Sequence, residues 1–370
     1  MMGVPQAAPA RRIGRFRAEI DAALDRVVGG DRYILGPAVE AFEAEFAAYL
    51  GVAHCIGVGT GTDAVTLALR ALEVGPGDEV ITVSLTAAGT AQAILLCGAE
   101  LRFVDVDRIT RCMDPNAVEA AITPRTAAIV PVHLFGQPAD ILRLVSIADR
   151  HGLAVVEDCA QAHGAVIGAR KVGSFGHAGA FSFYPTKNLG GIGDGGAVVC
   201  RDAATAARVR SLRCYGWDDE TRISRRLAGN SRLDEVQAAI LSALLVHLDE
   251  GNDERRALAA EYRRRLHGLG LGMPPDGPGS VYHQFAVACD SREALRRNLW
   301  DHAGIGTAVH YFPALHRQPA FHVAGVSRLP NTEALAESLL SLPIQPEVAG
   351  PNLARIAEAV RTEVGRCKRS

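Results

Sequence analysis

The sequence has little lysine, little net charge and no long apolar run. Only three of its 39 basic residues are lysines, namely Lys171, Lys187 and Lys368, and the others are arginines. Arginine stays protonated in proteins and cannot act as an amine nucleophile, whereas lysine can. Any amine chemistry therefore has three candidate residues, and we expect Lys368 to lie in a frayed C-terminal end.

The near balance of charge argues against a nucleic-acid-binding protein. The chain carries 39 basic and 41 acidic residues, so its net charge of −2 leaves no basic excess for nucleic acid. No stretch of about 18 residues lacks polar side chains, so we expect no membrane span. Arg11 and Arg12 precede no apolar stretch, so we expect no export signal.

The eight cysteines form no C-x-x-C motif, and most of them lie scattered inside apolar runs. This distribution is typical of reduced core residues. It favours a cytoplasmic protein.

A mostly parallel sheet covered by helices is predicted for the first two thirds of the chain. Short β-rich apolar runs alternate there with helical patterns, which is typical of crossover units in an α/β fold. The seven expected strands are His54–Val58, Glu79–Val83, Leu101–Val106, Ala127–Val132, Leu153–Glu157, Gly179–Tyr184 and Gly196–Cys200. The expected helices are Arg15–Val28, Pro37–Leu50, Asp63–Leu72, Gly89–Leu96, Asn116–Ile122, Ala139–Arg150 and Leu233–Leu248.

Two domains are predicted from the length of 370 residues and from a change in composition after Asp249. Residues 1–248 form the expected large domain, and residues 249–370 a smaller α+β domain. The expected elements of the smaller domain are a strand, Tyr282–Ala288, and the helices Glu250–Leu266, Arg292–His302, Thr332–Leu340 and Leu353–Val364.

The segment Gly59-Thr60-Gly61-Thr62-Asp63 follows a predicted strand and opens a predicted helix. Glycines let a ligand approach the backbone, and a helix N-terminus offers free N–H groups to an anion such as phosphate. A capped turn with no ligand explains the same residues. The third glycine of G-x-G-x-x-G is absent, which argues against a dinucleotide-binding oxidoreductase.

Glu157 and Asp158 end the fifth predicted strand, at the sheet edge where α/β proteins place ligands. A carboxylate there could bind a metal ion, a ribose or a protonated ring nitrogen, or it could cap a helix. His163 is the one further metal ligand nearby, which is too few for a metal site, so we expect no metal.

Lys187 follows the sixth predicted strand and precedes the glycine-rich segment Gly190–Gly196. A partly buried lysine has a lowered pKa and can form a Schiff base with an aldehyde. An exposed lysine at a strand end is the alternative. Lysine is scarce in this chain, and Ser182 supplies a hydroxyl donor nearby, so we favour the functional interpretation.

Together these three motifs supply what pyridoxal 5'-phosphate requires. Its phosphate needs backbone donors, its ring nitrogen needs an anionic partner, and its aldehyde needs an amine.

The chain resembles the fold-type I pyridoxal-phosphate enzymes, and specifically the DegT–DnrJ–StrS family of sugar aminotransferases. The resemblance extends from about Ile20 to Ala359 and is most specific in Val155–Ala165, Gly179–Gly196 and Gly229–Leu241. It implies a homodimer with the active site at the subunit interface, and a large domain with a seven-stranded sheet.

The resemblance also implies roles for individual residues. Lys187 is similar to the lysine that binds the cofactor and moves the proton, and Asp158 to the partner of the ring nitrogen. The other implied cofactor-binding residues are Gly61, Thr62, Asp63 and Ser182 at the phosphate, Ala160 and Gln161 at the ring, and Asn230 from the neighbouring subunit. The implied substrate-binding residues are Tyr33, Tyr215, His310, Tyr311 and His316.

Ala87 departs from the family pattern, because most members carry an aromatic residue there that stacks on the cofactor ring. About 0.5–1.5 kcal/mol of aromatic pairing is lost with alanine. Members that act on 3-keto sugars look similar at this position. The family also contains dehydratases with histidine in place of the lysine, and the presence of Lys187 disfavours that reaction.

The resemblance implies transfer of an amino group from L-glutamate to a nucleotide-linked keto-deoxy sugar. Ala87 favours C3 of a dTDP-3-keto-6-deoxyhexose, and a 4-keto nucleotide sugar or a keto-cyclitol is an alternative. A non-catalytic regulatory or scaffold protein of the same fold is an alternative of another class.

Overall fold

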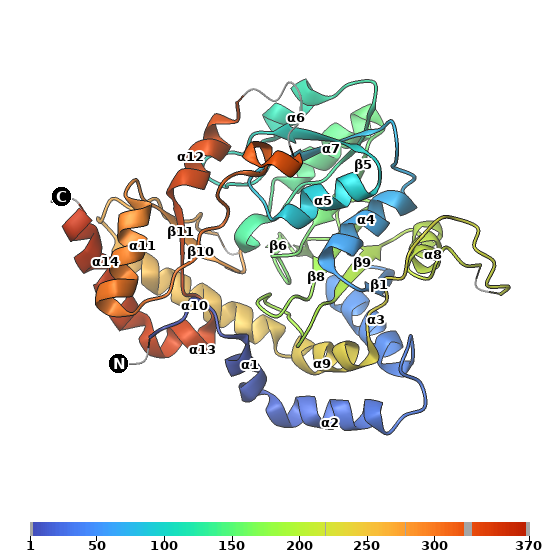
Figure 1. The fold of residues 1–370 in the computed structure, drawn as a ribbon, viewed down its shortest axis with the longest axis horizontal. Helices are drawn as coiled ribbons and strands as arrows, with labels where there is room; N and C mark the ends of the chain where they lie inside the picture. Colours follow the sequence, from blue (N-terminus) through green and yellow to red (C-terminus); the bar gives the residue numbers. More distant parts are fainter. Residues whose placement is uncertain (1–2, 219, 278, 322–327, 368–370) are drawn as a thin grey trace.

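The computed structural model describes residues 3–218, 220–277, 279–321 and 328–367, which form an α/β fold around one large sheet (Figure 1). Lys368 lies outside the described residues. No helix in the described part of the chain is both long enough and apolar enough to cross a membrane.

The sheet has seven strands, as expected, and their order in the sheet is β1-β9-β8-β5-β4-β2-β3. Only β9 runs antiparallel to its neighbours. The strands are β1 (His54–Val58), β2 (Glu79–Val83), β3 (Glu100–Val104), β4 (Thr126–Ile129), β5 (Ala154–Asp158), β8 (Ala178–Ser182) and β9 (Gly196–Cys200). All seven predicted strands are confirmed, with small shifts at the ends of four of them.

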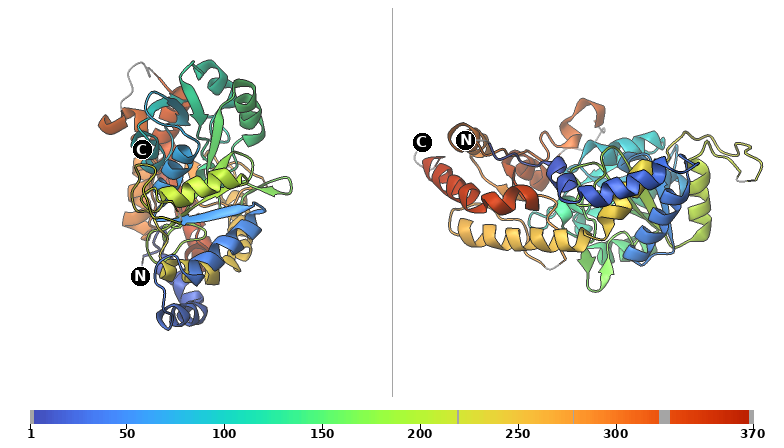
Figure 2. Two further views of the ribbon diagram at one scale, coloured as in Figure 1. Left: turned by 90° about the vertical axis from the view of Figure 1, so that its right-hand side faces the viewer. Right: turned by 90° about the horizontal axis from the view of Figure 1, so that it is seen from below.

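Helices cover both faces of the sheet, because its strands are apolar on both sides (Figures 1 and 2). Ala178 and Ala180 of β8 pack in a cluster with the helices on one face, whereas Phe181 packs on the other face. The first face carries α4 (Gly61–Ala71), α5 (Ala88–Leu96) and α8 (Ala203–Leu212). The second face carries α3 (Pro37–Leu50) and α9 (Glu235–Leu245). The helices α6 (Pro115–Ala121) and α7 (Ile141–His151) pack with β2, β3, β4 and β5.

Several elements differ from the sequence-based expectations. The first expected helix, Arg15–Val28, is α2 (Arg17–Val28), and an additional helix, α1 (Pro9–Arg15), precedes it. The two are separate because Phe16 leaves helical geometry and stacks on His247 at 4.1 Å. Helix α8 and a short hairpin of β6 (Val166–Ile167) and β7 (Arg170–Lys171) were not expected.

The predicted C-terminal end of the helix Thr332–Leu340 is wrong. It stops at Ser338, and β11 (Leu339–Leu342) begins there because its backbone pairs antiparallel with β10 (Phe285–Ala288). The other C-terminal elements are α10 (Leu248–Leu266), α11 (Arg292–Ala303), α12 (Pro330–Ser338), α13 (Pro346–Ala349) and α14 (Leu353–Cys367).

The N-terminal segment packs against the C-terminal elements. Val4 is buried in their apolar cluster, its amide donates to Gly304 at 2.8 Å, and its carbonyl accepts from Gly306 at 2.7 Å. The described ends of the chain therefore lie at the same end of the molecule (Figures 1 and 2). The domain boundary after residue 248 stays a prediction.

Candidate active site

A cavity of about 450 Å³ lies at the carboxyl ends of β5 and β8, beside the N-termini of α4 and α5. Parallel strands place their ligand sites at this edge. The cavity brings together nine of the residues predicted for the site: Gly61, Thr62, Ala87, Asp158, Ala160, Ser182, Lys187, His310 and Tyr311.

The N-terminus of α4 forms one end of the cavity. Thr60 caps this helix, because its Oγ1 accepts from the amide of Asp63 at 3.0 Å. A Cβ on Gly61 would lie 2.5 Å from Cβ of Ser182, so only glycine lets the helix start so close to β8. Free amides of the first turn and the Ser182 hydroxyl thus face one small space, which suits a phosphate.

Asp63 does not line the cavity. Its Oδ2 accepts from Oγ of Ser231 at 2.8 Å. The same Ser231 hydroxyl oxygen accepts from the amide of Gly59 at 2.9 Å. The carboxylate therefore ties α4 to the segment before α9.

Asp158 is buried, and both of its carboxylate oxygens are held in place. Oδ2 accepts from Oγ1 of Thr90 at 2.7 Å, and Oδ1 accepts from the amide of Ala160 at 3.1 Å. Thr90 also lines the cavity and lies 3.0 Å from Oγ1 of Thr86. These contacts hold a carboxylate where the nitrogen of a protonated ring could meet it.

The neighbouring Glu157 supports the fold on the other face of β5. Its carboxylate accepts from the amides of Gly173, Phe175 and Gly176 and from Nε2 of His133. Burial raises the pKa of Glu157, but the hydrogen bonds from His133 and the amides outweigh this effect and lower it.

His133, Glu157 and Cys159 lie close enough together to hold a metal ion. Nδ1 of His133 accepts from the amide of Ala139 at 3.0 Å, so the proton is on Nε2 and is donated to Glu157. Burial raises the pKa of Cys159 well above its ordinary value, which keeps the thiol protonated. His133 and Glu157 are therefore arranged to hydrogen-bond each other and the neighbouring backbone, which stabilises the fold around β5.

Lys187 lies in the loop after β8, and its side chain enters the cavity. Burial lowers the pKa of Lys187 to about 8, although the charge of Asp158 acts in the opposite direction. A larger fraction of this amine is therefore neutral near physiological pH than for an ordinary lysine. A neutral amine is the form that attacks an aldehyde or accepts a proton.

His283 and Gln284 also line the cavity and were not predicted. Burial lowers the pKa of His283 well below its ordinary value, with a further contribution from Lys187. Nδ1 of His283 lies 3.2 Å from Oδ1 of Asn188, whose amide nitrogen already donates to Asn252 and to the carbonyl of Val281. Nδ1 is therefore the donor, and neutral His283 keeps its lone pair on Nε2.

Tyr311 is joined to Gln161, which does not itself line the cavity. Nε2 of Gln161 donates to the Tyr311 hydroxyl at 2.9 Å, and its Oε1 accepts from the amide of Phe135 at 2.8 Å. Burial raises the pKa of Tyr311 to about 12 and lowers that of His310 to about 4, so both groups are neutral at pH 7.

Besides Asp63 and Gln161, four other predicted residues do not line the cavity of this chain. Tyr33 is 57% exposed, and Tyr215 is partly exposed. Asn230 is exposed at the end of the segment between α8 and α9, which extends away from the body (Figure 1). His316 is buried, with Nδ1 2.6 Å from Oγ of Ser84 and Nε2 3.1 Å from Glu333.

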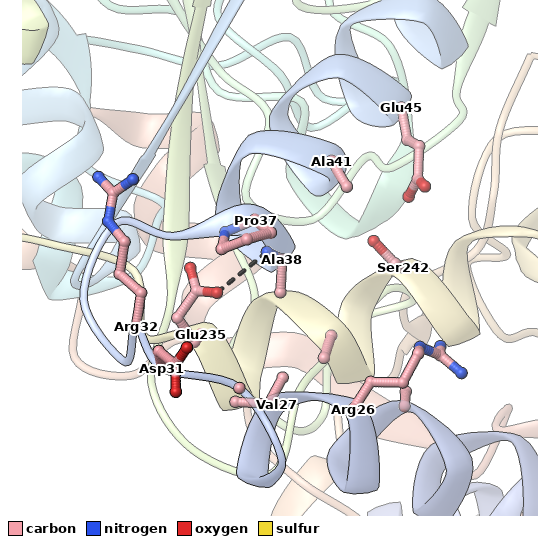
Figure 3. Close-up of a pocket in the computed structure, with 13 residues that line it drawn as sticks. Arg26, Val27, Asp31, Arg32, Pro37, Ala38, Ala41, Glu45, Glu235 and Ser242 are labelled. Carbon is pink, nitrogen blue, oxygen red and sulfur yellow. Dashed lines mark hydrogen bonds between the residues drawn. The ribbon is translucent and has the colours of Figure 1, made fainter.

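A second cavity of about 610 Å³ lies between α2, α3 and α9 (Figure 3). No lysine is among the described residues that line it. Glu235 caps α3 there by accepting from the amides of Gly36, Ala38 and Val39. The cavity around Lys187, in contrast, presents an amine.

The residues of that cavity fit pyridoxal phosphate. Glycine makes room for an anion at α4, Asp158 presents a fixed carboxylate, and Lys187 presents an amine with a lowered pKa. Ala87 leaves a methyl group where an aromatic ring could stack.

Comparison with known proteins also indicates a pyridoxal-phosphate enzyme. The model of the DegT/DnrJ/EryC1/StrS aminotransferase family matches residues 15–361. The chain is 49% identical over 352 residues to a dTDP-3-amino-3,4,6-trideoxy-alpha-D-glucose transaminase of Streptomyces venezuelae, covering 94% of this chain and 92% of that protein. It is 47% identical over 350 residues to a UDP-N-acetyl-3-dehydro-alpha-D-glucosamine 3-aminotransferase of Acidithiobacillus ferrooxidans, covering 94% of each.

A similar solved structure is that of S. venezuelae DesV in complex with a ketimine intermediate. Its TM-score is 0.95 at 46% identity, over 98% of this chain and 99% of that chain. The chain therefore belongs to the DegT/DnrJ/EryC1/StrS aminotransferase family, whose members depend on pyridoxal phosphate.

Proposed function

We propose that this enzyme transfers an amino group from L-glutamate to C3 of a nucleotide-linked keto-deoxy sugar, a dTDP-3-keto-6-deoxyhexose. The observation that carries the proposal is the convergence of Lys187, Asp158 and the N-terminus of α4 in one cavity. The names of both relatives place the amino group at C3, and their nucleotides differ. The small residue Ala87 supports the same position.

The chain's own residues divide the work of the reaction. The bound cofactor supplies an electron sink for the carbanion that forms when a proton leaves carbon. Asp158 would keep the ring nitrogen of the bound cofactor protonated by its negative charge, and Thr90 and the amide of Ala160 fix its carboxylate in place. Nζ of Lys187 takes the proton from the donor's α-carbon in one half-reaction and delivers a proton to the sugar carbon in the other.

The neutral side chains of the cavity suit a sugar substrate. His283, His310 and Tyr311 come from the C-terminal part of the chain and line the same cavity as Lys187. Because burial disfavours their charged forms, they are suited to hydrogen bonds with hydroxyl groups.

Borohydride reduction of the protein with bound cofactor, followed by peptide mapping, tests the site. We expect the label on Lys187, and a label on Lys171 alone would refute the assignment. Adding glutamate to the same protein then separates an enzyme from a scaffold protein. Conversion of the cofactor spectrum to the pyridoxamine form indicates catalysis, whereas an unchanged spectrum supports the scaffold.

A panel of nucleotide-linked sugars tests the substrate. Incubation with glutamate and 3-keto or 4-keto sugars on dTDP and UDP, read by product mass and NMR, should give amination of the dTDP-linked 3-keto sugar. Faster amination of a 4-keto sugar or a keto-cyclitol would overturn the assignment to C3.

We also infer that the enzyme works as a homodimer, with Asn230 of each subunit at the other subunit's cavity. Asn230 is exposed and lies outside the cavity of its own chain, and Leu227 beside it is 92% exposed. A contact with a second copy would cover these side chains.

A cytoplasmic location is the accompanying inference. Its support is the set of buried thiols, Cys55, Cys97, Cys112, Cys159 and Cys200, which are typical of a reducing compartment.

A further inference from the structure

The guanidinium of Arg12 donates hydrogen bonds to the loop that carries Lys187. Its Nη1 donates to the carbonyls of Lys187 at 2.6 Å and Asn188 at 2.9 Å. Its Nη2 donates to the carbonyls of Pro185 at 3.0 Å and Gly190 at 2.9 Å. One side chain from α1 thus holds four carbonyls within six consecutive residues of the loop.

The arrangement needs the fork of an arginine. A planar guanidinium points its N–H groups in fixed directions, whereas the ammonium of a lysine is a compact point charge. The loop is also shaped for it, because a Cβ on Gly190 would lie 2.8 Å from Nη2 of Arg12. Arg12 is partly buried, and burial lowers its pKa, whereas the charge of Glu347 raises it.

Helix α1 is itself fixed to the C-terminal part of the chain. The amide of Ala8 donates to Oε1 of Gln345 at 2.8 Å, and Nε2 of Gln345 donates back to the carbonyl of Ala8 at 3.0 Å. Arg11 donates to the carbonyl of Glu347 at 3.3 Å. Arg12 therefore connects the lysine loop to elements that lie more than 150 residues further along the chain.

We propose that Arg12 is a positioning residue, which fixes the backbone of residues 185–190 and thereby the direction and shielding of the Lys187 amine. The inference rests on the proposed role of Lys187. Within the described part of the chain, the hydrogen bonds of the Arg12 guanidinium all go to backbone carbonyls of this loop, so its expected effect on the reaction is through Lys187.

Three variants of the full chain, prepared without cofactor, test the proposal. Arg12→Met removes both the charge and the fork, whereas Arg12→Lys keeps the charge and removes the fork. Arg15→Met is the matched control, because Arg15 lies on the same helix and pairs at the surface with Glu250 and Glu254. Circular dichroism confirms that each variant is folded.

Hydrogen exchange reads the loop directly. The amide of Lys187 donates to the carbonyl of Tyr184 at 2.9 Å, and the amide of Gly191 to that of Phe183 at 2.9 Å. In Arg12→Met we expect these amides to exchange about tenfold faster or more, since local opening becomes easier. We expect Arg12→Lys to behave like Arg12→Met within about threefold, and Arg15→Met to match the unaltered chain.

Acylation of the Lys187 amine at a series of pH values gives a second measurement. In Arg12→Met we expect the apparent pKa of Lys187 to rise by about one unit, because the amine becomes better solvated. The proposal is overturned if Arg12→Met has the same amide exchange rates in the loop and the same Lys187 pKa as Arg15→Met. It is also overturned if the loop amides of Arg12→Lys exchange as slowly as those of the unaltered chain. A borohydride label on another lysine of the unaltered protein would instead refute the role of Lys187, whatever the exchange result.

Discussion

The charge of Asp158 raises the pKa of Lys187 in the shared cavity, and this effect can be measured without substrate. Without cofactor, we expect acylation of Lys187 to rise through pH of about 8, where burial places its pKa. Because Asp158 raises that pKa, Asp158→Asn should move the midpoint further down. Competitive labelling over a pH range measures both values, and a midpoint near 10.5 would contradict the burial of this amine.

Asp158 and Glu157 are adjacent carboxylates with separate roles, so matched substitutions should have different effects. Asp158→Asn should lower kcat by about 100-fold or more, because the ring nitrogen loses its anionic partner, with little change in stability. Glu157→Gln should lower stability by about 1–3 kcal/mol, because an amide NH₂ then faces backbone donors. Steady-state kinetics and urea unfolding separate the two effects, and a stability loss confined to Asp158→Asn would reverse these roles.

The place of a single residue in the site was predictable where the residue lies in a recognisable local motif. Lys187 is one of three lysines, and Asp158 ends an apolar strand, so the sequence alone indicates both. His283 and Gln284 directly precede β10, far along the chain, and nothing near them in the sequence shows that the fold brings them to the cavity of Lys187. Asp63 lies in the right motif, but its carboxylate is taken by Ser231, a contact that only the tertiary structure shows.

Among the helices, α4 depends on its first residue for a close approach to β8. Gly61→Ala places a Cβ 2.5 Å from that of Ser182, so α4 and β8 must separate. We expect a loss of about 1–3 kcal/mol of stability from this overpacking, and weaker cofactor binding because the phosphate site widens. Fluorescence titration of the cofactor and urea unfolding measure these effects.

Gly251→Ala is the control for Gly61→Ala. Gly251 lies inside α10, and a Cβ there meets no atom within 4 Å. This substitution should stabilise the protein by about 0.5–1 kcal/mol, since alanine has a higher helix propensity, and should leave cofactor affinity unchanged. Equal cofactor affinities for the two variants would contradict the role given to the α4–β8 contact.

The strands of the large sheet were predictable because each is a short apolar run bounded by turn residues. Strand β11 was not, because Leu339, Leu340 and Leu342 continue the apolar spacing of the preceding helix. Pairing with β10 overrides that local pattern. The break at Phe16 has a similar cause, since its ring packs on His247, a residue more than 200 positions away.

For the complete molecule, the inferred exchange of Asn230 between subunits can be tested by mixing defective chains. Lys187→Met and Asn230→Ala should each lower activity on their own. After joint unfolding and refolding, half of the dimers are mixed, and each mixed dimer holds one intact site. We therefore expect about a quarter of the unaltered activity. If the mixture shows only the summed residual activities, Asn230 does not act across subunits.

The attachment of α1 to Gln345 has a consequence for how the protein is made. Ala8 and its anchor, Gln345, are 337 positions apart, so the contact that holds α1 can form only after Gln345 has been translated. The nascent chain therefore contains Lys187 long before its loop is held in place. We expect capture of the vitamin B6 cofactor to follow the synthesis of Gln345.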